Sequence, residues 1–145
     1  MTGENPDELP TDDLPGETRV FRVIRPDEVM PASDGRQRPK SSEFTDHRED
    51  NAMSVFLESD VTAAGRSIEQ VLECGMFEPG SHLYWLPLSY YRENGQIVTR
   101  AAIDAFPGHA NVRDANGKRS GGLQTRMAKN SIQLERGADP AGGAE

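Results

Sequence analysis

The sequence lacks the features of several large classes of protein. One cysteine among 145 residues excludes an internal disulfide and any zinc site that needs two or more thiolates. No stretch approaches the roughly 20 apolar residues needed to cross a bilayer. The N-terminus also has neither the basic start nor the apolar run of a signal peptide. We therefore expect a soluble, cytoplasmic protein that makes no contact with a membrane.

Hydrophobic residues are scarce, at 34% of the chain. A chain of this length typically forms one domain, and its low apolar content predicts a small core with long uncovered segments. The formal net charge of −8 disfavours a surface built to hold nucleic acid, although a local basic groove is compatible with that charge.

Basic residues are absent from the first 17 positions. This segment carries six of the acidic residues and three prolines, so it repels itself and buries nothing. We expect residues 1–17 to form a disordered acidic tail, residues 18–136 one folded domain, and residues 137–145 a second disordered tail. The tail either solubilises the protein or docks on a basic partner. Without the acidic tail, the chain carries only about −2.

Short apolar and aromatic runs between Pro and Gly residues predict strands. The clearest of them is Arg19–Arg25. Ser67 and Gln70 have the spacing of a capping box, which predicts the main helix over Ser67–Cys74. Ser131–Glu135 alternates like an edge strand, although a frayed helix fits it nearly as well. Further strands are predicted at Met53–Leu57, Leu83–Leu86, Ile97–Thr99 and Ala110–Arg113, with a helical turn at Leu88–Arg92.

These elements predict an α+β domain with a small, mostly antiparallel sheet of short strands and one main helix. The connection from Pro26 to Asp50 is long enough to be functional or disordered. It contains a basic cluster followed by two serines: Arg36, Arg38, Lys40, Ser41 and Ser42.

Guanidinium groups bind phosphate or carboxylate with two hydrogen bonds, and serine hydroxyls add donors. The basic cluster with its serines therefore predicts an anion pocket, to which Arg22 and Arg25 of the first strand would contribute. The alternative is a solvated basic loop that complements the acidic tail. Neither of the two standard glycine-rich nucleotide-phosphate loops is present.

Three histidines, His47, His82 and His109, lie too far apart for a metal site formed by local spacing, so we expect no metal and no cofactor. His109 follows a Pro-Gly turn and is a candidate general base, against the alternative of a histidine that bonds loop carbonyls. Cys74 ends the predicted helix and is interpreted as a small buried hydrophobe.

Three stretches resemble blocks in a group of small uncharacterised bacterial proteins, written R-P-x-S-S-x-F, M-S-V and P-A-H-A-x-V. They are Arg38–Phe44, Asn51–Val55 and Pro107–Val112. The chain departs from the last block at Gly108, where the pattern has alanine. The resemblance implies a shared domain of no known activity. If the group has a common site, the implied members are Arg38, Ser41, Ser42, Ser54 and His109.

The leading functional hypothesis is a binding or protein-interaction module of a bacterial cytoplasm that uses the Arg36–Phe44 loop and the His109 turn. Its partner would be a protein or a small anionic ligand. A second hypothesis is a small enzyme acting on a phosphorylated or nucleotide-like ligand, with Arg22 and Arg38 as anion clamps and His109 as acid or base. A third is an antitoxin-like or inhibitor role for the acidic tail.

Overall fold

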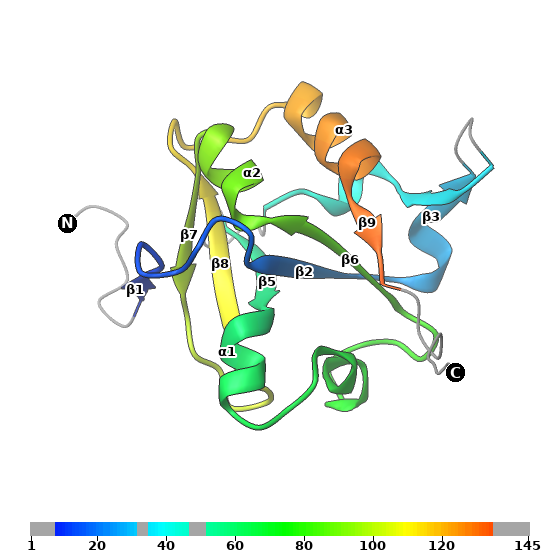
Figure 1. Ribbon diagram of the computed structural model, residues 1–145. Helices are drawn as coiled ribbons and strands as arrows, with labels where there is room; N and C mark the ends of the chain where they lie inside the picture. The colour runs from blue at the N-terminus through cyan, green and yellow to red at the C-terminus, as the bar shows by residue number, and fades with distance from the viewer. Residues whose placement is uncertain (1–7, 32–34, 47–51, 135–145) are drawn as a thin grey trace.

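A seven-stranded antiparallel sheet forms the centre of the computed structural model, which describes residues 8–31, 35–46 and 52–134 (Figure 1). The strand order is β1-β7-β8-β5-β2-β6-β9. The predicted α+β class is therefore confirmed. The strands are β1 (Leu9–Pro10), β2 (Arg19–Ile24), β5 (Met53–Leu57), β6 (His82–Pro87), β7 (Gln96–Arg100), β8 (His109–Asp114) and β9 (Ile132–Gln133).

Helices cover both faces of this sheet (Figure 1). One face, here called the α3 face, packs against α2 (Leu88–Glu93) and α3 (Gly121–Asn130). The opposite face, the α1 face, packs against α1 (Glu58–Ala63) and the 3₁₀ helix η3 (Ile68–Glu73). Beside α3 lie the hairpin β3 (Val29–Pro31)–β4 (Gln37–Pro39) and the 3₁₀ helix η2 (Ser41–Glu43); η1 (Pro26–Glu28) precedes the hairpin.

Side-chain alternation along the strands explains why both faces are covered. Neighbouring residues of a strand point to opposite faces of the sheet. In β2, Val20 joins the core of the α3 face and Phe21 joins the core of the α1 face, and both are fully buried. In β5, Val55 and Phe56 divide in the same way. β2 and β5 therefore contribute buried apolar residues to the cores on both sides of the sheet.

The main helix is not where the sequence predicted it. Ser67 and Gln70 form the expected capping box, but the segment they begin is the 3₁₀ helix η3. The longest helix is α3, whose glycines lie in its first turn, where they weaken a helix less than in its middle. The Ser120 side chain accepts a hydrogen bond from Leu123 N at 3.1 Å and caps this helix.

The predicted boundary of the acidic tail is wrong for residues 8–17. Leu9–Pro10 pair with β7, and Thr11 is buried with its hydroxyl donating to Val98 O at 2.8 Å. Carboxylates that repel one another in isolation are attracted here by arginines of the sheet. Residues 1–7 and 135–145 lie outside the described residues. Within the predicted edge strand, Ile132–Gln133 form β9, which pairs with β6. In the described part, no helix is long and apolar enough to cross a bilayer.

Candidate functional site

Two arginines hold the segment from Ser41 to Asp46 against the sheet. Arg22 of β2 donates from Nε to Glu43 O at 2.9 Å and from Nη1 to Ser54 O at 2.8 Å. Arg119 donates from Nη1 to Asp46 Oδ1 at 2.7 Å and to Phe44 O at 3.3 Å. The position of this loop is therefore determined by side chains that are distant in sequence.

Arg119 is buried although it carries a charge, with 2% of its surface exposed. Its other donors reach Gln96 Oε1 at 2.7 Å and Val112 O at 3.2 Å. Burial lowers the pKa of Arg22 and raises the pKa of Tyr91, whose ring lies in the same core. The phenol therefore stays neutral, the Arg22 guanidinium is hydrogen-bonded by backbone carbonyls, and the charge of Arg119 is balanced by the Asp46 carboxylate.

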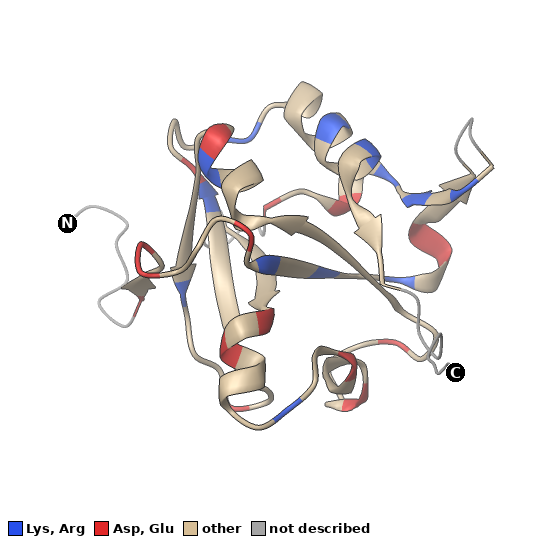
Figure 2. Ribbon diagram, in the orientation of Figure 1, with Lys and Arg blue, Asp and Glu red and all other residues tan. Residues whose placement is uncertain are grey.

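Basic residues from two distant segments meet beside this loop. The hairpin is tied down by Tyr84, whose hydroxyl donates to Gln37 O at 3.3 Å, and by Lys40 N, which donates to Glu28 O at 2.8 Å. The helix α3 runs alongside β4 and η2. Figure 2 shows the basic residues of α3 next to those of β4. We call this surface the basic face; it comprises Arg36, Arg38, Lys40, Arg126 and Lys129.

The residues predicted for one site are divided between the two faces of the sheet. Arg22 lies on the α3 face and holds the segment that contains Ser41 and Ser42. His109 lies on the α1 face, where its ring meets the Phe56 ring edge-on at 5.4 Å. Its Nδ1 is 2.6 Å from Ala101 O, which is the contact expected of a histidine that bonds loop carbonyls.

The other predicted residues follow the same division. Arg38 lies in β4 on the basic face. The Ser54 side chain faces the α1 side with His109, because Ser54 pairs with Asn111 and Phe56 pairs with His109 in adjacent strands. Ser54 reaches Arg22 only through its backbone carbonyl. The structure therefore forms no single pocket from these six residues.

His47 lies outside the described residues, and in the described ranges no three His, Cys, Asp or Glu residues cluster as metal ligands.

Sequence reasoning missed a second polar cluster, on β7 and β8. The Glu8 carboxylate accepts hydrogen bonds from Arg113 at 2.6 and 3.1 Å and from Asn111 Nδ2 at 3.0 Å. The Thr99 hydroxyl also donates to it. Alternation of His109, Asn111 and Arg113 along one strand places all three side chains on the α1 face. That alternation was the available signal in the sequence.

The Glu8 cluster predicts a pH-dependent stability. Burial raises the pKa of Glu8, but hydrogen bonds from Arg113, Thr99 and Asn111 outweigh it and hold the pKa below the ordinary 4.5. Because the carboxylate is favoured in the folded state, its contribution is complete above that ordinary value and is lost as the pH falls through the lowered pKa.

We expect the free energy of unfolding to fall between about pH 5 and pH 3, and to fall less in Glu8→Gln. Urea titrations over this range measure both slopes. Asp12→Asn is the matched control, since Asp12 is exposed and is absent from the Glu8 cluster. Equal slopes in wild type and Glu8→Gln would show that Glu8 does not link folding to pH.

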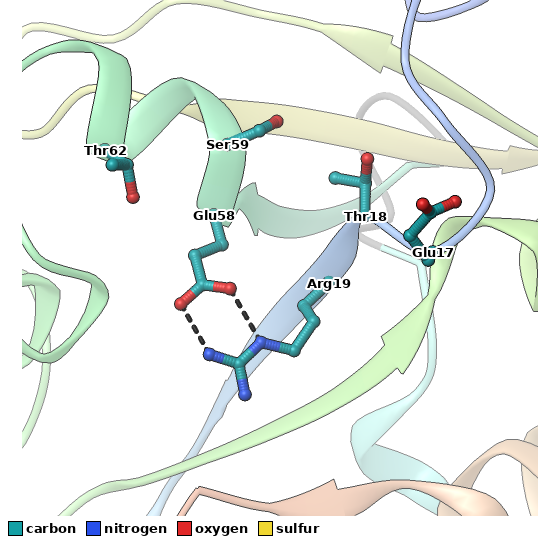
Figure 3. Close-up of a pocket in the computed structure, with 6 residues that line it drawn as sticks. All are labelled: Glu17, Thr18, Arg19, Glu58, Ser59 and Thr62. Atoms are coloured by element: carbon teal, nitrogen blue, oxygen red, sulfur yellow. Dashed lines mark hydrogen bonds and ion pairs between the residues drawn. The ribbon is translucent and has the colours of Figure 1, made fainter.

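A shallow hollow of about 550 Å³ lies at the start of α1 (Figure 3). Inside it, Arg19 donates from Nε and Nη2 to the two carboxylate oxygens of Glu58, each at 2.6 Å. The guanidinium also lies 5.2 Å from the centres of the Phe21 and Trp85 rings. Since this charge is already paired, the hollow offers no free cation for an anionic ligand. Its lining comprises Glu17, Thr18, Arg19, Glu58, Ser59 and Thr62.

Comparison of the chain with family models, with curated proteins and with solved structures finds no match. The candidate sites therefore depend on geometry and charge alone.

Proposed function

We propose that this chain is a protein-interaction module that binds an acidic segment of a partner protein through the basic face. The observation that carries the proposal is the meeting of residues 36–40 with α3, some 85 positions later in the chain. Local clustering of charge in sequence is common, whereas two basic segments packed side by side in an acidic protein form a surface with a definite sign.

Three of the charges on this face are available to a ligand. Lys40, Arg126 and Lys129 are exposed, and within the described part of the chain none of them forms an ion pair. By contrast, Arg19 of β2 is paired with Glu58, and Arg119, which lies just before α3, is paired with Asp46. Exposed, unpaired charges such as those of Lys40, Arg126 and Lys129 raise the rate at which an acidic partner associates.

The hollow at the start of α1, the kind of site that suits a small molecule, is lined by none of the residues of the basic face. The formal net charge of −8 opposes a nucleic acid, whose phosphates would be repelled at long range. A short acidic segment of a protein meets the basic face alone and avoids most of that repulsion. His109 lies on the other face of the sheet, so the proposed surface does not include it.

Charge reversal tests the proposal. We expect Lys40→Glu/Lys129→Glu to weaken binding of a fluorescein-labelled Glu-rich peptide by about tenfold or more at low salt, measured by fluorescence anisotropy, because two attractive charges become repulsive. The matched control is Arg66→Glu/Lys118→Glu, which changes the net charge equally at two exposed positions outside the basic face.

The control should retain nearly wild-type affinity. An equal loss in both variants would mean that only the total charge matters. A single-stranded DNA oligonucleotide serves as a second probe. Tighter binding of this DNA than of the peptide would contradict a protein partner.

A further inference from the structure

The N-terminal segment of residues 8–14, here called the strap, lies along β7 like a bound peptide (Figure 1). Leu9 and Pro10 pair with Arg100 and Thr99 of β7 as a two-residue strand. The Thr11 hydroxyl donates to Val98 O of the same strand. The strap therefore extends the sheet at what would otherwise be its edge.

Arginines from three elements hold the strap. Arg113 of β8 binds the Glu8 carboxylate, and Arg100 of β7 binds the Asp13 carboxylate at 2.9 and 3.1 Å. Arg92 of α2 donates from Nη2 to Thr11 O at 2.8 Å and to Leu14 O at 3.0 Å. These contacts recognise carboxylates at positions 8 and 13 and backbone carbonyls at positions 11 and 14.

Part of the receptor side of this contact is held in place by residues outside the strap. Arg100 is also held by Asp60 of α1, with Nε 2.7 Å from Oδ2. Thr99 and Asn111 are opposite each other in the register of β7 and β8, so sheet pairing alone aligns them for Glu8. A site supported in this way by its own sheet and by α1 can accept a different occupant.

The strap is attached by polar contacts more than by apolar burial. Leu9 is 59% exposed, and the Asp13 side chain is 66% exposed. Leu14 is only partly buried against the core. Since little apolar surface is exposed when the strap leaves, its opening requires less free energy than global unfolding. Added salt weakens its ion pairs further.

We propose that β7 with Arg92, Arg100 and Arg113 is a binding site for an extended acidic segment of a partner protein, and that the strap is its intramolecular occupant. The partner segment adds a strand to β7 after displacing the strap, a recognised mode of peptide binding. Its chemistry follows the strap, with one carboxylate at the Glu8 position and another at the Asp13 position. Because the strap is part of the same chain, it competes with the partner segment at a high effective concentration. It occupies the site until an acidic segment that binds more tightly displaces it.

The test uses the full chain and a blocked peptide with the sequence of residues 8–16. Binding is followed by NMR shifts of the β7 backbone amides. We expect Glu8→Gln/Asp13→Asn, which loosens its own strap, to bind the peptide at least tenfold more tightly than the wild type. A peptide carrying the same two substitutions should show at least tenfold weaker binding, and salt should reduce binding of the unsubstituted peptide.

Asp12→Asn is again the matched control and should bind the peptide as weakly as the wild type. Lys40→Glu/Lys129→Glu should leave peptide binding at β7 unchanged, which separates this site from the basic face. Three results would overturn the inference: no binding to the loosened variant, equal binding of the substituted peptide, or dimerisation of the loosened variant without peptide, which would assign the site to exchange between copies.

Discussion

Replacing Arg119 with methionine is expected to lower the free energy of unfolding by about 3–5 kcal/mol, the cost of breaking a buried ion pair from one side. Methionine fills much of the volume but donates no hydrogen bond. The Asp46 carboxylate, which is 14% exposed, loses its partner. The carbonyls of Phe44 and Val112 and the Gln96 amide oxygen also lose their donor.

Urea unfolding at neutral pH measures this change. Arg119→Lys keeps the charge, but its single ammonium does not reach all four acceptors, so we expect it to be destabilised as well. The neighbour Lys118 is exposed, and Lys118→Ala should change the free energy of unfolding by no more than about 0.5 kcal/mol. If the Arg119→Met protein has the same free energy of unfolding as the wild type, Arg119 does not hold the loop in place.

Replacing Gly108 with alanine is expected to cost about 2–5 kcal/mol, from two separate causes. Its φ of +85° is a conformation that disfavours any residue with a Cβ by about 1–2 kcal/mol. A Cβ would also lie 2.5 Å from Val61 Cγ2 and 3.0 Å from Leu57 O, so α1 has to shift. The turn before His109 thus depends on glycine.

Gly117→Ala separates the two causes. Gly117 has a φ of +100°, and nothing lies within 4 Å of the position of its Cβ. It should therefore show the conformational cost alone, about 1–2 kcal/mol. Thermal or urea unfolding of both variants gives the steric part as the difference. If both substitutions cost the same, α1 does not pack against Gly108 as described.

Arg119 and Gly108 both belong to tertiary contacts that no local sequence pattern shows. Arg119 is one of several basic residues around Lys118 and Arg126, and the sequence offers no sign that it alone is buried. Its neighbours in space, Gln96 and Asp46, are far from it in the chain. The Gly108 turn was recognised from its Pro-Gly pair, but its close approach to α1 was not.

Local signals were sufficient for most of the sheet. The predicted strand at Met53–Leu57 coincides with β5. The predicted strand at Arg19–Arg25 is one residue longer than β2. β-branched and aromatic residues bounded by turns carry this information within a few positions. The capping box was also local and is present, yet the six residues that it begins form a 3₁₀ helix and not the predicted α-helix.

Composition misled the prediction for residues 8–17. Acidic residues and prolines predict disorder only if the chain meets no complementary charge. Here Arg100 and Arg113 neutralise Asp13 and Glu8, and Leu9–Pro10 pair with β7. The partner charges lie about 90 to 105 residues away in sequence, so composition of the segment itself contains no trace of them.

Taken alone, the sequence determined the α+β class, the position of most strands and the basic character of residues 36–40, because these depend on nearby residues. Only the tertiary structure decided that His109 and the basic loop lie on opposite faces, that α3 completes a basic face, and that the acidic strap binds the sheet. Each depends on sheet order, which is determined by how buried surfaces and distant charges fit together.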